Sequence, residues 1–282
     1  MPEVPDTIQE MEQILPGGSS PDLRLNLQGS TLHIELNRPH RGNALRSVDC
    51  ARLATLIDHL GTAEVPSVRA VLLSGEGRHF CTGGDLEAAG AQSSPRIGHL
   101  QRSLRRGAAR LVQSLWDCPL PVVAAVNGRA MGLGLHVALA SDFIFAAGSA
   151  RLSEPFSQRG FAVDSGGSLL LPLRIGLARA TDMLMRGGIV DAATAARWGL
   201  VTEVVPGDDA VQVARQRADE LAAGPTVAIG ETKQLMRSAA SAQLAAAMDR
   251  EARSVELTIR SRDFKEGIAA FGEKRQPQFT GS

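Results

Sequence analysis

Residues 122–136 read VVAAVNGRAMGLGLH, and this stretch decides the fold. Its first five residues are valine and alanine only, which predicts a short buried strand. Three glycines, Gly128, Gly132 and Gly134, follow closely and predict a loop with unusual backbone angles. The apolar run over residues 133–140 predicts a helix. A buried strand that enters a helix through a glycine loop is typical of an α/β fold.

A second glycine loop lies earlier in the chain. Residues 75–86, GEGRHFCTGGDL, follow residues 69–73, which predict another buried strand. Glycines leave backbone N–H groups open to a ligand, and the start of a helix offers further unpaired N–H groups. Two such loops could direct one N–H group each at the same oxygen, which is what an oxyanion hole requires. A plain surface turn is the alternative interpretation of the earlier loop.

The spacing Gly128-x-x-x-Gly132-x-Gly134 also fits the glycine pattern of short-chain dehydrogenases. Those enzymes use a tyrosine as an acid, and this chain contains no tyrosine. The pattern also lies in the middle of the chain, whereas a dinucleotide fingerprint follows a first strand. Neither loop ends in the Gly-Lys-Ser/Thr of a phosphate-binding P-loop. These two kinds of nucleotide site are therefore excluded.

The rest of the chain divides into an α/β part and a helical part. Residues 23–28 and 31–36 alternate about Gly29 and Ser30, which predicts a β-hairpin. Further predicted helices cover residues 45–60, 167–171, 178–185 and 192–198, and further predicted strands cover residues 143–145 and 200–205. After Pro206 the sequence predicts only helices, over residues 210–237 and 242–261, which indicates a helical subdomain or an oligomerisation element.

The composition is that of a soluble globular protein. Of 282 residues, 44% are hydrophobic, and 30 basic side chains balance 30 acidic ones, so no general attraction to nucleic acid or membranes is expected. The longest apolar runs are shorter than the roughly 20 residues that cross a bilayer. Three widely spaced cysteines lack the spacing of a metal or redox site and suit a reducing cytoplasm. The acidic residues 1–20 predict a partly disordered extension rather than a secretory signal.

Four motifs together resemble one known family. They lie, in order, in residues 36–45, 80–86, 121–134 and 271–279. In this combination the chain resembles the enoyl-CoA hydratase/isomerase (crotonase) superfamily. The resemblance implies an α/β fold in which ββα units form a spiral over residues 21–206, followed by a C-terminal helical trimerisation region over residues 207–282. It also implies a homotrimer or a dimer of trimers.

The resemblance further implies that the substrate is an acyl-CoA thioester. Coenzyme A is then part of the substrate, and neither a tightly bound cofactor nor a metal is expected. The backbone N–H groups of Gly84 and Leu133 match those that bind the thioester oxygen in this family. Leu133 replaces a glycine of many members, so its side chain narrows the acyl pocket while its N–H group remains. The positions that match coenzyme A contacts are Arg38, Arg41, Asn43, Ala44, Thr82, Gly83, Asp85, Leu86, Phe271 and Lys274.

Hydratases of this family hold a water molecule with two glutamates. The matching positions here are His136 and Phe156, so neither usual carboxylate is present. Residues 159–168, RGFAVDSGGS, instead resemble dienoyl-CoA isomerases and the ring-opening isomerases of phenylacetate degradation, which have their catalytic base at the position of Asp164. The resemblance therefore favours a double-bond isomerase of fatty-acid or aromatic-acid metabolism, in which Asp164 transfers the proton. The alternative is that Asp164 only caps a helix that begins at Ser165.

Two other functions are compatible with the sequence. A hydratase could use Glu154 or His136 together with Asp164, because a shift of two residues would place Glu154 where Phe156 is expected. Otherwise His136 is an interior histidine. A non-catalytic acyl-CoA-binding or RNA-binding protein could use the basic amphipathic helix predicted over residues 96–115. Nucleic acid is not an expected partner, since only 4% of the residues are aromatic and no stacking surface is evident.

Overall fold

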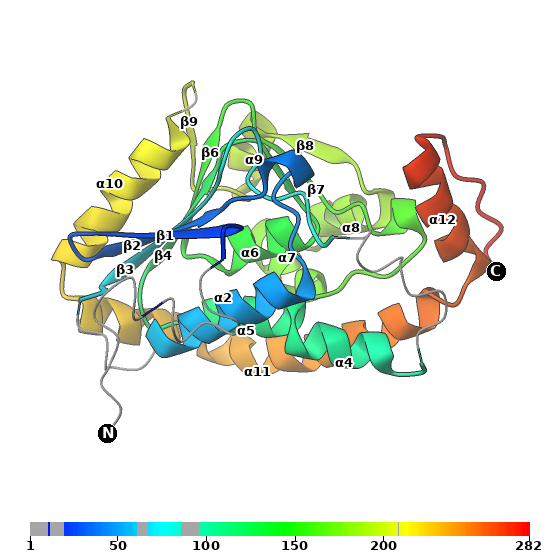
Figure 1. Ribbon diagram of the computed structural model, residues 1–282, viewed down its shortest axis with the longest axis horizontal. Coiled ribbons are helices and arrows are strands. Elements are labelled where there is room, and N and C mark those ends of the chain that lie inside the picture. The colour runs from blue at the N-terminus through cyan, green and yellow to red at the C-terminus, as the bar shows by residue number, and fades with distance from the viewer. Residues whose placement is uncertain (1–10, 12–19, 61–66, 86–95, 208) are drawn as a thin grey trace.

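The computed structural model describes Met11 and residues 20–60, 67–85, 96–207 and 209–282 (Figure 1). The extension predicted over residues 1–20 lies almost wholly outside the described residues, and so does Leu86. The described residues form two sheets with helices packed around them. The expected α/β fold with a helical C-terminal region is confirmed.

The larger sheet has six strands in the order β1-β2-β3-β4-β6-β9. β1 and β2 form the predicted antiparallel hairpin, and all later neighbours pair in parallel. β3 and β4 are buried along their whole length, because helices cover both faces of the sheet (Figure 1). The strands are Leu23–Gln28 (β1), Thr31–Leu36 (β2), Ala70–Gly75 (β3), Val122–Val126 (β4), Phe143–Ala147 (β6) and Glu203–Val205 (β9).

The smaller sheet consists of three strands that the sequence did not predict. They are Arg129–Met131 (β5), Arg151–Ser153 (β7) and Ile189–Asp191 (β8). Each has three residues, which is too short for a period of two to be recognised. β5 pairs in parallel with β7, and β7 pairs antiparallel with β8. β4, β5 and helix α6 (Leu133–Ala140) therefore form one ββα unit, and β6, β7 and α7 (Gly167–Ile175) form the next.

Helix α10 (Ala210–Ala223) covers one face of the larger sheet, as Figure 1 shows in yellow. Every fourth residue from Ala210 to Ala222 is a buried alanine that packs against the strands. Residues four apart lie on the same side of a helix, and small side chains there allow a close approach to the sheet. The other face is covered by α6 together with α2 (Ser47–Leu60) and α5 (Ala108–Asp117).

The C-terminal helices differ from the prediction. Instead of a break at residues 238–241, α11 continues from Thr226 to Thr258, because serine and alanine are compatible with a helix interior. The break lies at Gly224 and Pro225, where proline has no N–H group with which to continue α10. A further helix, α12 (Arg262–Glu273), is absent from the prediction.

The basic helix predicted over residues 96–115 is divided at Gly107 into α4 (His99–Arg106) and α5. α11 crosses α4, α5 and α7 (Figure 1). The remaining elements are η1 (Pro39–Arg41), η2 (Ser157–Arg159), α8 (Leu177–Arg186) and α9 (Ala192–Trp198). In the described part of the chain, no helix is both long and apolar enough to cross a membrane.

The alanines of α10 give a test of this packing. Ala214→Leu places a larger side chain between α10 and the sheet, where the side chain at this position is fully buried. We expect the free energy of unfolding to fall by about 1–3 kcal/mol, measured by urea denaturation. Ala223→Leu on the exposed side of the same helix is the control and should change the free energy by less than about 0.5 kcal/mol. An equal loss of unfolding free energy in the two variants would contradict the close packing of α10 on the sheet.

Candidate active site

The two glycine loops lie side by side and are joined by backbone hydrogen bonds. Cys81 and Ala130 form a parallel bridge, in which the Cys81 N–H donates to the carbonyl of Arg129 and the Met131 N–H donates to the carbonyl of Cys81, each over 3.0 Å. The approach requires glycine, because a Cβ atom at Gly134 would clash with the Cys81 carbonyl oxygen. The loops therefore hold a fixed relative position.

A second bridge sets the direction of the backbone at Gly84. Leu45 donates its N–H to the carbonyl of Gly83, and Asp85 donates its N–H to the carbonyl of Leu45, each over 2.9 Å. Backbone groups of successive residues in an extended chain point to opposite sides, so the N–H group of Gly84 points away from Leu45. A Cβ atom added at Gly84 would meet no heavy atom within 4 Å.

The N–H group of Leu133 is available for a different reason. Leu133 is the first residue of α6, where the helix offers no acceptor for its N–H group. Among the described residues, no backbone carbonyl accepts a hydrogen bond from Gly84 or Leu133. The two glycine loops are close here, since a Cβ atom at Gly83 would lie 4.0 Å from the Leu133 nitrogen. The arrangement supplies two neighbouring N–H donors.

Gly84 and Leu133 line one cavity of about 660 Å³. Its walls are largely apolar, which suits the acyl part of a ligand. One wall is formed by α4, another by the C-terminal half of α11 together with α12, and a third by the segment that follows β7. The apolar side chains of these walls are Leu100, Leu104, Phe156, Phe161, Val255, Ile259, Phe264 and Ile268.

Asp164 lines the same cavity. Burial raises its pKa from 3.8 to about 6, and the nearby His136 opposes this rise by favouring the carboxylate. The rings of Phe156 and Phe161 meet edge to face with their centroids 5.2 Å apart, and both rings line the same cavity as Asp164. A carboxyl group with a pKa near neutrality can both accept and donate a proton.

The side chain of Asp164 does not cap the helix that follows it. α7 begins at Gly167, and its free N–H groups at Gly166 and Ser168 donate to the carboxylate of Glu251, over 2.6 and 2.9 Å. The interpretation of Asp164 as a cap is therefore wrong, because Glu251 of α11 occupies that place. No signal in the sequence linked two residues so far apart. Ser165, which lies between Asp164 and Gly166, has a left-handed backbone with φ of 50°.

His136 and Glu154 are buried behind the cavity wall. Both are 0% exposed, and His136 Nε2 lies 3.1 Å from Glu154 Oε2. Burial alone would lower the pKa of His136, but the adjacent carboxylate outweighs it and the pKa is raised. The His136 ring stacks on Phe156 with centroids 5.7 Å apart, and of these three residues only Phe156 lines the cavity. The two candidates for hydration therefore pair with each other and do not line the cavity.

Comparison with known proteins identifies the family of the chain. The family model described as enoyl-CoA hydratase/isomerase matches residues 26–282. The chain belongs to the enoyl-CoA hydratase/isomerase family. It is 39% identical to a "Probable enoyl-CoA hydratase" of Rhodobacter capsulatus, over 92% of this chain and 98% of that protein. It is 36% identical to the 1,2-epoxyphenylacetyl-CoA isomerase of Escherichia coli, over 91% and 97%. The crystal structure of an enoyl-CoA hydratase/isomerase from Pseudoalteromonas atlantica superposes with a TM-score of 0.82 at 34% identity, covering 92% of this chain and 100% of that one.

In this enoyl-CoA hydratase/isomerase family member, two of the expected coenzyme A contacts, Arg38 and Asn43, hold the segment at residues 38–44 against the first glycine loop. The Asn43 side chain is buried and donates to the carbonyls of Glu76 and His79, over 3.0 and 2.6 Å. Protein groups therefore occupy this side chain, and a contact between Asn43 and coenzyme A stays a prediction. Arg38 donates to the Ala44 carbonyl over 2.7 Å and to the Asp85 carboxylate over 3.1 Å.

The other expected contacts lie near the cavity or at the end of α12. Gly83 and Asp85 line the cavity, and Arg41 lies 3.9 Å from Asp85. Thr82 donates its N–H to the carbonyl of Gly42 and thereby joins the first glycine loop to the turn that contains Ala44. Phe271 and Lys274 are exposed.

Phe271 lies against Arg159, whose guanidinium carbon is 4.4 Å from the centre of the ring. Sequence reasoning missed Arg159, which lines the cavity, and the whole of α12. α12 packs on η2 at two glycines, since a Cβ at Gly160 would clash with Asp263 and one at Gly267 with Arg159. The amphipathic pattern of residues 262–273 is the signal that could have revealed it. The family member thus closes the cavity with its own C-terminal helix.

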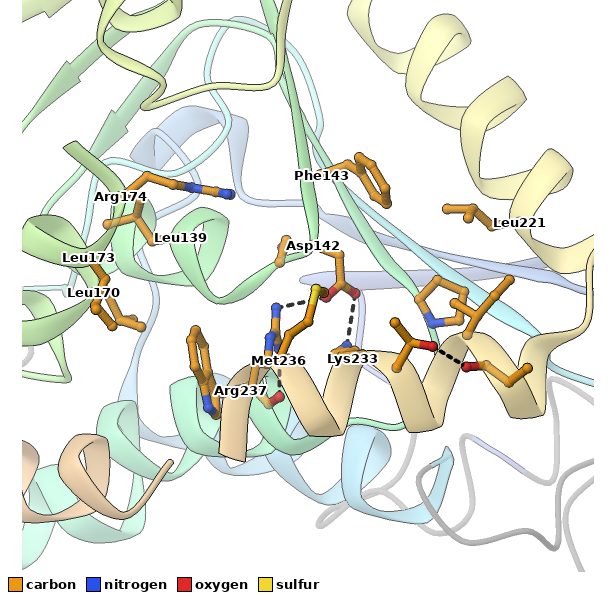
Figure 2. A pocket seen from close by; sticks show the side chains of 16 residues that line it. Leu139, Asp142, Phe143, Leu170, Leu173, Arg174, Leu221, Lys233, Met236 and Arg237 are labelled. Carbon is orange, nitrogen blue, oxygen red and sulfur yellow. Dashed lines mark hydrogen bonds and ion pairs between the residues drawn. The ribbon is translucent and has the colours of Figure 1, made fainter. Parts of the chain in front are cut away.

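A second cavity, of about 630 Å³, lies between α11, α7 and the start of β6 (Figure 2). It contains neither glycine loop nor Asp164. The carboxylate of Asp142 accepts from Lys233 over 2.8 Å and from Arg237 over 2.7 Å, as the dashed lines in Figure 2 show. Leu170, Leu173 and Met236 are among its apolar residues. These ion pairs fix α11 to the sheet, and the other cavity is the candidate active site.

The contact between the glycine loops predicts the effect of one methyl group. Gly134→Ala forces the two loops apart, because the new Cβ meets the Cys81 carbonyl oxygen. We expect the free energy of unfolding to fall by about 1–3 kcal/mol, measured in urea. Gly148→Ala is the matched control, since its Cβ meets nothing within 4 Å. The same urea midpoint for both variants would show that the stability of the protein does not depend on this contact between the loops.

Proposed function

We propose that the protein is an acyl-CoA-processing enzyme of fatty-acid or aromatic-acid metabolism, and specifically a double-bond isomerase. One observation carries the proposal: Asp164, with a pKa near neutrality, shares a cavity with the two N–H donors at Gly84 and Leu133. The relative named 1,2-epoxyphenylacetyl-CoA isomerase supports it. Coenzyme A is part of the substrate, and no tightly bound cofactor takes part.

The two N–H groups bind the thioester oxygen. When a proton leaves C2 of a 3-enoyl-CoA, negative charge moves from C2 onto this oxygen, and the enolate forms. Donors that already point at the oxygen stabilise this charge without rearrangement, and one such donor contributes about 10²–10³ in rate. Because the donors are backbone groups held by the Cys81 bridge, they keep their positions as the charge develops.

Asp164 moves the proton. Its carboxylate accepts a proton from C2, and the electrons of that bond spread over C2, C3 and C4 and onto the thioester oxygen. The carboxylic acid then returns a proton at C4, the double bond shifts to C2, and the carboxylate is restored. Both steps are favourable for one group only if its pKa lies near neutrality, as burial provides here.

A hydratase is the second candidate, favoured by the relative named as a probable enoyl-CoA hydratase. Hydration requires a group that positions water in addition to the one that transfers the proton. Among the described residues of the cavity, the acidic side chains are Asp85 and Asp164, and Asp85 pairs with Arg38. Glu154 and His136 do not line the cavity and pair with each other. The isomerase needs no second acidic group at the cavity.

A non-catalytic acyl-CoA-binding or RNA-binding function is supported less well. The helix predicted to carry a basic face turns Leu100 and Leu104 of α4 into the cavity. For the assembly we propose a homotrimer or a dimer of trimers in the cytoplasm. Leu173, Leu177 and Met236 are large apolar side chains that are more than half exposed in a single chain, which supports self-association.

Replacement of the proposed base predicts a large loss of turnover. Asp164→Asn should lower kcat by about 10²- to 10⁴-fold, because the amide cannot take the proton. The dissociation constant for a saturated acyl-CoA should stay within about threefold, because Gly84 and Leu133 are untouched. Asp182→Asn, on an exposed part of α8, is the control and should retain activity. Full activity of Asp164→Asn would exclude this residue as the base.

The pKa of Asp164 predicts the pH dependence of the wild-type enzyme. Only the carboxylate accepts the C2 proton, so kcat/KM should rise with pH, reach half its maximum near the pKa of about 6 and level off above it. The rate is therefore lost as the pH falls through that value. A profile without an inflection between about pH 5 and 7 would contradict the assignment.

The reaction itself is tested by offering 3-hexenoyl-CoA and 2-hexenoyl-CoA to the purified protein in parallel. An isomerase converts the first into the second, and in D₂O deuterium enters at C4 to the extent that the Asp164 carboxylic acid exchanges its proton with solvent before returning it. A hydratase adds water to the second substrate and forms 3-hydroxyhexanoyl-CoA. Rapid hydration without double-bond migration would replace the isomerase by the hydratase.

A further inference from the structure

Helix α11 has a fixed position relative to the sheet because its first half is anchored by buried charges. Lys233 and Arg237 pair with Asp142, and Arg237 also donates to the Trp116 carbonyl over 2.6 Å (Figure 2). The Arg237 guanidinium lies 4.2 Å from the centre of the Trp116 ring. Breaking a buried pair of this kind leaves an uncompensated charge, so α11 resists displacement.

The second half of α11 presents a glutamate to the start of α7. Glu251 is 5% exposed, and its two carboxylate oxygens accept from the N–H groups of Gly166 and Ser168. α7 has no cap of its own, since Gly166 stands at the cap position. A carboxylate at a helix N-terminus satisfies free N–H groups and faces the positive end of the helix dipole.

A second glutamate of α11 does the same for α4. Glu256 accepts from the Gly98 N–H over 2.9 Å and from the Gln101 N–H over 3.3 Å. Gly98 is the cap residue of α4 and has no side chain with which to cap it. Glu256 also pairs with Arg260 one turn further along α11. One helix therefore caps two others, five residues apart along its length.

Both capped helices border the candidate active site. Two residues separate Asp164 from α7, and both have a left-handed backbone: φ is 50° at Ser165 and 88° at Gly166. α4 contributes His99, Leu100, Ser103 and Leu104 to the cavity wall. Between the two glutamates along α11, Val255 lines the cavity as well.

We propose that Glu251 and Glu256 are positioning residues with separate effects. Glu251 holds the left-handed turn that places Asp164 beside the thioester, and Glu256 holds α4, the wall that sets the length of acyl chain accepted. The effect of Glu251 on turnover rests on the proposed isomerase function. The effect of Glu256 on acyl-chain length rests only on the cavity.

The charges around Asp164 give Glu251 a second, measurable effect. Among the described residues, the titratable groups near Asp164 are His136 on α6, Glu154 after β7, Glu251 on α11 and the thiol of Cys50 on α2. Burial raises the pKa of Asp164 most, His136 lowers it, and Glu251 and Glu154 raise it further. Loss of the negative charge at Glu251 should therefore move the acid limb of the pH profile to lower pH.

The test compares Glu251→Gln and Glu256→Gln with Glu231→Gln, an exposed glutamate of the same helix. We expect Glu251→Gln to lower kcat for 3-hexenoyl-CoA at least about tenfold, with dissociation constants for saturated acyl-CoAs changed less than about threefold. Glu256→Gln should leave that kcat within about threefold and change the ratio of the dodecanoyl-CoA and butanoyl-CoA affinities at least about fivefold. Glu231→Gln should change neither quantity. Glu251→Asp, which keeps the charge, should restore the acid limb of the pH profile.

Amide hydrogen exchange tests the capping contacts independently of turnover. Exchange at Gly166 and Ser168 should accelerate in Glu251→Gln only, and exchange at Gly98 and Gln101 in Glu256→Gln only. If the wild type turns over no enoyl-CoA, the proposed function fails, whereas the exchange and affinity measurements still decide this proposal. The positioning proposal is overturned if Glu251→Gln lowers only the melting temperature while kcat is kept. It is also overturned if Glu251→Gln and Glu256→Gln both change kcat or both change the ratio of acyl-CoA affinities.

Discussion

The backbone bridge between Cys81 and Ala130 is the contact on which the rest of the site depends. It joins two loops that leave different strands of the central sheet, and it does so without any side chain. The parallel sheet brings the ends of β3 and β4 to one edge, and glycine at position 134 removes the Cβ that would keep the loops apart. The N–H groups of Gly84 and Leu133 therefore lie at the same cavity. Every later feature of the cavity is arranged around that pair.

The sequence predicted those parts of the fold in which local pattern and tertiary environment agree. β1, β2, β4 and α6 have the predicted bounds, because apolar runs and glycines there suffice to define a strand, a turn or a helix. It also brought Gly84, Leu133 and Asp164 together through family resemblance, and the structure places them on one cavity. The three-residue strands escaped prediction because they exist only through pairing with distant partners. The buried side chain of Asn43 and the capping by Glu251 escaped for the same reason. The continuity of α11 escaped because serine and alanine at residues 238–241 are compatible with a helix as well as with a break.

Burial raises the pKa of both Glu154 and Asp164, but the two carboxyl groups have different surroundings. Glu154 lies 3.1 Å from His136 inside the protein, whereas Asp164 lines the cavity. Phe156 lines the cavity, and the His136 ring stacks on it. Of the two carboxyl groups, only that of Asp164 borders the cavity. Geometry rather than residue type decides which carboxylate can meet a substrate.

Because the donors at Gly84 and Leu133 belong to the main chain, a substitution removes their N–H groups only if it introduces proline. Substitutions at Leu133, along α4 or along α12 change the walls and leave the polar pair intact. Side chains of the cavity walls can therefore diverge while the two N–H donors keep their positions. In the proposed reaction, Asp164 is the side chain that must be kept along with them.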